Sequence, residues 1–197
     1  MKDNTKVKSE NKSNLKLFEA FAGYGGASYG LQRAKIPYET VGYSEIDKFA
    51  IEFYENNLPG ILNFGDITKI NPHDIPDFDL FTGGFPCQPF SQAGHKRGFK
   101  DSHKSERGNL FFNIVEILEA KKPKAFFLEN VRGIVNHDGG NTFKVIRNKL
   151  EDEMGYSFHY EVIKASDYGL PQLRPRAFMI GFRDEGILSG FAFPPHL

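Results

Sequence analysis

A short apolar strand, a glycine-rich turn and a helix follow one another near the N-terminus, and this order constrains the possible folds most. Residues 15–21, LKLFEAF, have the pattern of a buried strand, and residues 29–34 that of a helix. Between them, residues 22–28 read AGYGGAS. This order is typical of doubly wound α/β folds, in which the turn brings the backbone close to a nucleotide cofactor. Ser28 stands in place of the third glycine of the dinucleotide fingerprint, so the turn is not that motif.

The rest of the chain alternates apolar and helical segments, as a sheet with helices on both faces requires. Further strands are predicted at residues 38–43, 61–64, 78–81, 124–128, 156–165 and 177–182. Helices are predicted from a capping Asp47 to Asn56, over 110–118 with a stop at Pro123, and over 141–153 after a surface turn that contains His137. We therefore expect one domain over residues 15–195, preceded by a polar, lysine-rich and disordered tail at residues 1–14.

Composition narrows the classes of function. The formal net charge of the 197 residues is zero, so nucleic-acid binding must depend on a local basic patch. A single cysteine excludes an intrachain disulfide and a cysteine-cluster zinc site. The chain has neither an apolar run of membrane-spanning length nor the core of a signal peptide, so we expect a cytoplasmic location. The H-x-E and C-x-x-C pattern of zinc deaminases is absent as well.

The only cysteine, Cys87, lies in the segment GGFPCQPFS at residues 83–91, directly after an apolar run. The two glycines give a sharp exit from the predicted strand, and the prolines on either side of the thiol stiffen the backbone. A free cysteine is more often a small buried apolar residue than a nucleophile. Composition alone favours that simpler interpretation, whereas the position after a strand of an α/β fold favours a nucleophile.

Carboxylates follow three of the predicted strands. Glu45 lies about twenty residues beyond the glycine turn, where doubly wound folds place the acid that binds ribose hydroxyls. Glu129 follows the strand at 124–128 and is either a helix cap or a site residue. Asp66 belongs to the sequence GDIT, which taken alone is a common turn. The alternative for Glu45 is a solvated carboxylate at the start of a helix.

A long polar segment at residues 91–109 has a positive excess. Its cations are Lys96, Arg97, Lys100, Lys104 and Arg107, with His95 and His103, against the acids Asp101 and Glu106. A segment of this length without apolar periodicity is usually a functional loop or disordered. Its charge suits contact with nucleic-acid phosphates, and a solvated loop is the alternative.

Five motifs occur in the order found in one enzyme family. They are FAGYGG at 21–26, GDIT at 65–68, GFPCQPFS at 84–91, ENV at 129–131 and QLRPR at 172–176. Together they resemble the N-terminal catalytic half of the cytosine-5 DNA methyltransferases of bacterial restriction–modification systems. The resemblance runs from about Leu15 to Pro195 and implies a Rossmann-like sheet, mostly parallel with an antiparallel final strand, that binds S-adenosylmethionine (SAM).

The resemblance also implies roles for individual residues. Expected cofactor-binding residues are Phe21, Ala22, Gly23, Gly25, Gly26, Glu45, Ile46, Asp66, Ile67, Pro86 and Leu110. Expected substrate-binding residues are Gln88, Ser91, Asn130, Val131 and Gln172, and expected catalytic residues are Cys87, Glu129, Arg174 and Arg176. The basic segment 91–109 would be the loop that closes over DNA. No metal is expected.

The implied chemistry is covalent catalysis on a base that has left the duplex. The Cys87 thiolate would add to carbon 6 of cytosine and make carbon 5 nucleophilic toward the methyl group. Glu129 would neutralise the charge that develops near nitrogen 3. Arg176 would orient the base or Glu129, and Arg174 would stabilise the flipped nucleotide or the surroundings of Cys87.

The family's target-recognition domain and C-terminal segment have no counterpart in these 197 residues. The expectation is a half-enzyme (a truncated chain, a split-gene subunit or a remnant) that acts on double-stranded DNA with a complementing chain. One alternative is an inactive SAM-binding or DNA-binding remnant. The other is an RNA cytosine-5 methyltransferase, against which the Pro-Cys-Gln sequence, in place of Pro-Pro-Cys, argues.

Overall fold

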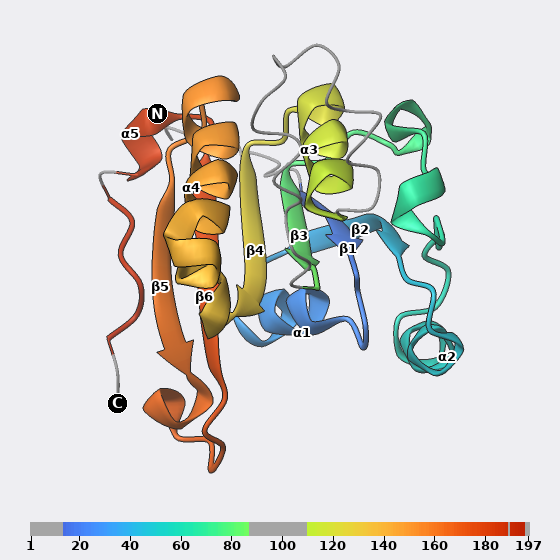
Figure 1. Ribbon diagram of the computed structural model, residues 1–197. Coiled ribbons are helices and arrows are strands. Elements are labelled where there is room, and N and C mark those ends of the chain that lie inside the picture. Colours follow the sequence, from blue (N-terminus) through green and yellow to red (C-terminus); the bar gives the residue numbers. More distant parts are fainter. Residues whose placement is uncertain (1–13, 87–109, 189, 196–197) are drawn as a thin grey trace, which may run out of the picture.

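The computed structural model describes residues 14–86, 110–188 and 190–195, and these ranges contain a six-stranded sheet of order β2-β1-β3-β4-β6-β5 (Figure 1). The strands are β1 (Leu15–Ala20), β2 (Tyr38–Ser44), β3 (Leu80–Gly84), β4 (Ala125–Val131), β5 (His159–Lys164) and β6 (Pro175–Phe182). The strands β2, β1, β3 and β4 pair with one another in parallel, whereas β6 is antiparallel to both β4 and β5. This confirms the predicted α/β sheet with an antiparallel final strand.

Helices cover both faces of the sheet. The described helices are α1 (Gly26–Arg33), α2 (Lys48–Asn57), α3 (Leu110–Lys121), α4 (Asn141–Asn148) and the short α5 (Glu185–Leu188). Figure 1 shows α3 and α4 in front of the sheet and α1 behind it. A π-helical turn, Lys149–Glu153, continues α4 and completes the helix predicted over 141–153. Asp47 caps α2 as predicted, because its carboxylate accepts hydrogen bonds from the backbone N–H groups of Phe49 and Ala50 at 3.0 and 2.9 Å. No helix in the described ranges combines the length and apolarity needed to cross a membrane.

The predicted strand at residues 61–64 is wrong. Only Asn63 pairs with the sheet, through an isolated bridge to Tyr43 of β2. Gly60 and Gly65 on either side have φ angles of 83° and 71°, a left-handed conformation that ends an extended segment. The Asn63 side chain is also hydrogen-bonded to the backbone of Glu45, directly after β2, and to that of Gly65. The apolar pattern therefore reflects packing beside β2 rather than a ladder.

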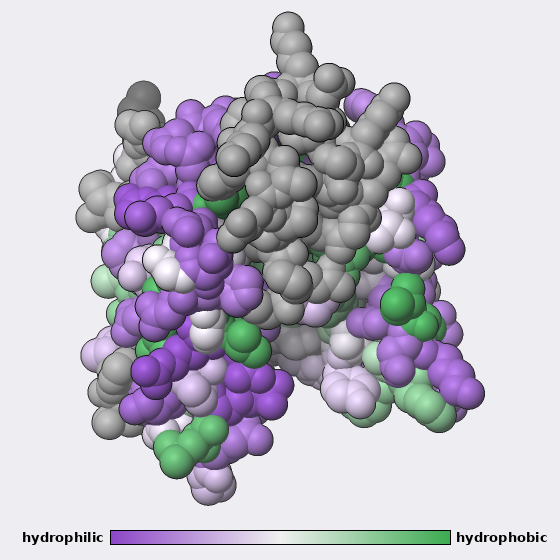
Figure 2. Space-filling model, viewed as in Figure 1, coloured by the Kyte–Doolittle hydropathy of each residue, from purple (hydrophilic) through white to green (hydrophobic). Residues whose placement is uncertain are grey.

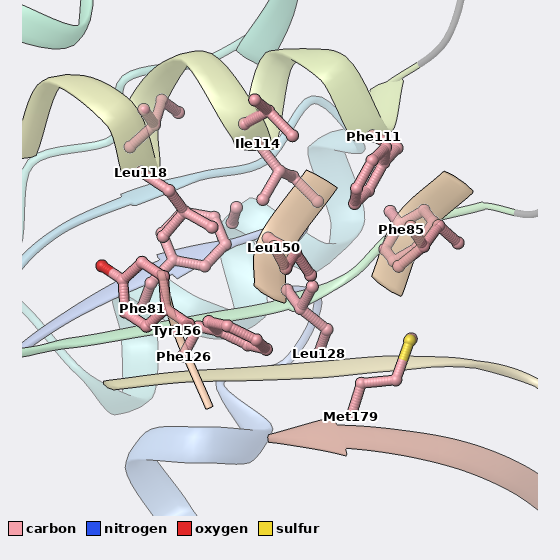
Figure 3. Packing of buried hydrophobic residues seen from close by; sticks show 14 of the residues in the cluster. Phe81, Phe85, Phe111, Ile114, Leu118, Phe126, Leu128, Leu150, Tyr156 and Met179 are labelled. Atoms are coloured by element: carbon pink, nitrogen blue, oxygen red, sulfur yellow. The ribbon is translucent and has the colours of Figure 1, made fainter. Parts of the chain in front are cut away.

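The main core lies between the sheet and the front helices. One face of α3 contributes Phe111, Ile114 and Leu118, which point toward the sheet residues in Figure 3. Aromatic rings fill much of the space, as the stacked pair of Phe18 and Phe81 shows with ring centroids 6.0 Å apart. This core fixes the distance between α3 and the strands β3 and β4. It thereby positions the walls of the site at the carboxyl ends of these strands.

Gly181 of β6 allows the closest packing in this core. A methyl group at this position would lie 2.3 Å from a ring carbon of Phe126 and 2.6 Å from the carbonyl oxygen of Ser157. Displacing the backbone oxygen of Ser157 would cost much free energy, because the backbone itself would have to move. A side chain at Gly181 would therefore push β6 away from β4.

We predict that Gly181→Ala lowers the free energy of unfolding by about 2–4 kcal/mol through overpacking. Gly30→Ala is the matched control, because Gly30 is exposed on α1 and has no atom within 4 Å of an added methyl group. That variant should be neutral or more stable by up to about 1 kcal/mol. Urea denaturation measures both; equal stability of the two variants would contradict the packing argument.

Candidate active site

The carboxyl ends of the parallel strands meet at one edge of the sheet, and a cavity lies there. Its volume is about 320 Å³. The lining comes from β1, β3, β4 and β6, from the glycine turn and from the start of α1: Glu19, Ala20, Phe21, Ala22, Gly26, Ala27, Thr82, Gly83, Gly84, Phe127, Glu129 and Phe178. The position agrees with the rule that doubly wound sheets bind ligands beyond the carboxyl ends of their strands.

A smaller cavity of about 60 Å³ shares Phe21 with the larger one. Six expected cofactor residues line it, together with Ser44 and Gly65: Phe21, Glu45, Ile46, Asp66, Ile67 and Leu110. Phe21 has a φ angle of 52°. This left-handed conformation is unfavourable for a bulky residue, and residues in such strained conformations are concentrated at functional sites. The structure therefore brings together residues from four separate segments of the sequence around one aromatic side chain.

Apolar side chains stand exposed near this cavity. Figure 2 shows apolar residues in the region of α2, among polar ones. The large exposed apolar residues of that part of the chain are Ile46, Phe49, Phe53 and Leu62. Ile46 is 71% exposed although it lines the smaller cavity, so it offers an apolar surface at the cavity mouth.

Glu45 connects the glycine turn to the end of β2. One of its carboxylate oxygens accepts a hydrogen bond from the Gly23 N–H at 2.8 Å. The other accepts from the N–H groups of Ile46 and Asp47 at 2.8 and 2.9 Å. Glu45 therefore holds the turn in shape, and the ribose contact stays a prediction, since each carboxylate oxygen can accept more than one hydrogen bond.

Asn63 supports the same region and was missed as a site residue in the sequence. Its side-chain oxygen accepts hydrogen bonds from the N–H groups of Glu45 and Gly65 at 3.2 and 2.9 Å, and its amide donates to the Glu45 carbonyl at 3.2 Å. Ser44 adds a bond from its hydroxyl to the Gly65 carbonyl at 2.7 Å. These contacts set the distance between Glu45 and the loop that carries Asp66. No local pattern in the sequence marks Asn63 for this role.

Asp66 is held as an ionised acceptor at the smaller cavity. Its carboxylate accepts hydrogen bonds from the Thr68 hydroxyl at 2.8 Å and from the Thr68 N–H at 3.0 Å. The hydroxyl, and after it the backbone N–H, lowers the pKa of Asp66 below its ordinary value. An ionised carboxylate is suited to accept a hydrogen bond from an amino group.

Glu129 and Arg176 form an ion pair at the larger cavity, with 2.7 Å between Glu129 Oε1 and Arg176 Nε. The antiparallel register places Val131 opposite Arg176 and so brings the second arginine of QLRPR to the end of β4. Arg174 and Gln172 lie before β6 and are exposed; within the described residues they line neither cavity. Their predicted roles remain predictions.

Asn130 holds the exit of β3. This side chain is 1% exposed, and its amide donates to the Phe85 carbonyl at 2.8 Å while its oxygen accepts from the Val131 N–H at 2.8 Å. The contact fixes the backbone directly before Pro86, the last described residue of this segment. The structure thus gives Asn130 a supporting position, and its substrate contact stays a prediction. Val131 itself is 42% exposed.

Several predicted site residues lie outside the described ranges, namely Cys87, Gln88, Ser91 and the basic segment up to residue 109. Conversely, the cavity includes residues that the sequence did not indicate: Glu19, Thr82, Phe127 and Phe178. Glu19 could have been noticed, because it is the one acid in β1 and follows the apolar pair Leu17 and Phe18. Within the described residues, no cluster of His, Cys, Asp and Glu could hold a metal ion.

We predict that Thr68→Val raises the pKa of Asp66 toward its ordinary value and lowers the free energy of unfolding at pH 7 by about 0.5 kcal/mol. Because the pKa is lower in the folded chain, the stabilisation is complete above the unfolded pKa and disappears as the pH falls through the folded pKa. Denaturation at several pH values measures it. In an Asp66→Asn background the same substitution should show no pH dependence; an unchanged pH dependence there would contradict the assignment.

Comparison with known proteins agrees with this geometry. Residues 15–195 match the family described as C-5 cytosine-specific DNA methylase. The chain is 48% identical to the Type II methyltransferase M1.ScrFI of Lactococcus lactis subsp. cremoris over 94% of this chain and 46% of that protein. It is 50% identical to M.HaeII of Haemophilus aegyptius, over 91% and 53%.

A solved structure extends the comparison to the fold. The S. pombe Dnmt2 methyltransferase superposes with a TM-score of 0.69 at 23% sequence identity, over 88% of this chain and 51% of that one. The chain thus spans about half the length of the curated relatives that it matches. With the family match over nearly all of the described residues, the chain belongs to the C-5 cytosine-specific DNA methylase family.

Proposed function

We propose that the chain is the catalytic half of a DNA (cytosine-5) methyltransferase that uses SAM. The observation that carries this proposal is the Glu129–Arg176 ion pair at a cavity next to the exit of β3. That exit leads through Phe85 and Pro86 directly to Cys87 in the sequence. A carboxylate and a guanidinium at this cavity, with a thiol three residues beyond β3 in the sequence, are the groups that methylation of cytosine at carbon 5 requires.

The described residues fit SAM in two respects. The smaller cavity offers the apolar side chains of Phe21 and Ile46 and the carboxylate of Asp66, which suit an adenine ring with an exocyclic amino group. The larger cavity continues from Phe21 toward Glu129, where the base would lie. When bound, SAM supplies an electrophilic methyl group on a sulfonium. Residues of the glycine turn, with Glu45 holding them, would position the ribose and the methionine end.

The reaction balances with the groups of this chain. The Cys87 thiolate forms a bond to carbon 6, and the electron pair of the 5,6 double bond makes carbon 5 nucleophilic, with charge delocalised to nitrogen 3. Carbon 5 would then take the methyl group that bound SAM supplies. Transfer of the carbon 5 proton to water restores the double bond and expels the Cys87 thiolate. The enzyme is regenerated without a redox step.

Glu129 and Arg176 act as a unit in this scheme. Glu129 donates or shares a proton at nitrogen 3, which removes the charge that the addition creates. Arg176 holds the Glu129 carboxylate through a charge-assisted hydrogen bond and fixes its direction. Gly84 contributes space, because a methyl group at that position would lie 3.1 Å from the second oxygen of Glu129. Arg174 would act on the flipped nucleotide.

Double-stranded DNA is the proposed substrate, and a further segment with a recognition domain is the proposed partner, in the same polypeptide or in another chain. The length of the relatives supports the partner, since this chain spans about half of them. The sheet face at the larger cavity supports it too. Phe127 and Phe178, with ring centroids 5.4 Å apart, are only half-buried there among the described residues.

We predict that Asp66→Ala weakens SAM binding by about 1–3 kcal/mol, the value of a hydrogen bond to a charged group. Asp74→Ala is the matched control, because Asp74 is an exposed carboxylate near Asp66 in the sequence whose oxygen accepts a hydrogen bond from Asn71. Calorimetric titration of the purified chain with SAM measures both. Equal affinity of the two variants would remove Asp66 from the cofactor site.

We predict that Cys87→Ala abolishes the covalent adduct with DNA that contains 5-fluorocytosine, in which the fluorine cannot leave as a proton does. The assay contains SAM and a chain that supplies the recognition domain; without that chain the signal should stay at background. Glu129→Gln should slow adduct formation by about 10²–10⁴-fold. Glu39→Gln on β2 is the exposed control. An adduct that survives Cys87→Ala would show that the nucleophile is another residue.

A further inference from the structure

Glu19 of β1 is a buried carboxylate at the larger cavity. It is 2% exposed and is among the residues that line the cavity. Its Oε1 accepts hydrogen bonds from the N–H groups of Ala27 and Ser28, both at 3.1 Å. Its Oε2 accepts from the Ser28 hydroxyl at 2.6 Å and from the Tyr54 hydroxyl at 2.7 Å. Both oxygens of the carboxylate therefore have hydrogen-bond donors.

The donors around Glu19 are neutral. Burial, and after it the charge of Glu19, raises the pKa of Tyr54, so this hydroxyl keeps its proton. Two of the other donors are backbone groups at the N-terminus of α1, whose dipole gives only a partial positive charge. Glu19 is therefore satisfied in hydrogen bonds, but its full negative charge is not neutralised by them.

No lysine, arginine or histidine within the described residues forms an ion pair with Glu19. The second acid of the cavity, Glu129, is paired with Arg176. Buried charges in proteins are usually paired, because removing an ion from water is costly. An unpaired buried carboxylate at a cavity wall thus favours a cationic group inside that cavity.

We propose that Glu19 is a specificity-determining residue whose charge favours the sulfonium of SAM over the neutral sulfur of S-adenosylhomocysteine (SAH), the product. This inference depends on the proposed function. Methyl transfer requires the donor sulfur to lie beside the base, so the sulfonium belongs in the larger cavity with Glu19. The two nucleosides differ at this sulfur by the methyl group and one unit of charge, and both keep the α-ammonium group. Glu19 therefore aids exchange of product for new cofactor.

The Glu19→Gln variant removes the charge with little change in shape. Its side-chain oxygen can still accept from the N–H groups of Ala27 and Ser28. Its amide would then face the hydroxyls of Ser28 and Tyr54, which can turn and accept hydrogen bonds. Ser28 has a second neighbour for its hydroxyl proton, since its oxygen lies 3.0 Å from the Thr40 hydroxyl. Loss of charge and loss of hydrogen bonding are thus separable at this position.

The test is calorimetric titration of the chain with SAM and with SAH, for the wild type and for each variant. Glu19→Gln should raise the dissociation constant for SAM by about tenfold, which corresponds to about 1.4 kcal/mol, and that for SAH by less than about threefold. Tyr54→Phe, which removes one hydrogen bond and keeps the charge, should leave the ratio of the two constants as in the wild type. Circular dichroism confirms that the variants are folded.

A second pair of variants covers the case in which Glu19→Gln does not fold. Glu19→Asp and Glu19→Asn have the same shorter length and differ in charge, and only the Asn variant should lose the preference for SAM. An equal loss for SAM and SAH in the neutral variants would overturn the inference and leave Glu19 as a cap of α1. If the wild-type chain binds neither nucleoside, the proposed function fails first, and this inference with it.

Discussion

The site depends on hydrogen bonds from polar side chains at strand ends to the backbone of neighbouring turns. Glu45 holds the glycine turn, Asn63 holds the segment before Asp66, and Asn130 holds the exit of β3. The bonds of Glu45 and Asn130, and those of Asn63 to Glu45, join segments that are distant in the sequence. They also leave few buried backbone groups unpaired. The hydrogen bonds of the fold itself therefore hold the turns in shape, as a preorganised site requires.

The antiparallel pairing of β6 with β4 sets the second part of the site. If β6 were shifted by one residue, Arg176 would point to the other face of the sheet and lose Glu129, because side chains alternate along a strand. Core packing opposes such a shift. Gly181 fits against the Phe126 ring only in the present register, and Phe126 is itself fully buried. The position of the ion pair is thus fixed by packing on the opposite face of the sheet.

Charge is distributed unevenly over the two cavities. The acids that line them are Glu19, Glu45, Asp66 and Glu129. Within the described residues, two cations pair with these acids: Arg176 with Glu129, and the exposed Lys69 with Asp66. A polyanion would be repelled from such a surface, whereas a cationic cofactor would be attracted. The contact with DNA phosphates that we propose would then lie elsewhere, and the sequence of residues 91–109 has the positive excess that such a contact needs.

The sequence by itself determined the type and order of most elements, the glycine turn and the Asp47 cap, because local periodicity and local motifs indicate them. It also determined the grouping of the acids at strand ends, because parallel strands end at the same edge of a sheet. It wrongly predicted a strand at 61–64, where an isolated bridge has the same apolar pattern. Only the tertiary structure decided that Arg176 pairs with Glu129, that Asn63 and Asn130 support the turns, and that Glu19 lies at the cavity. Those contacts depend on register and packing between distant segments, for which local sequence carries no signal.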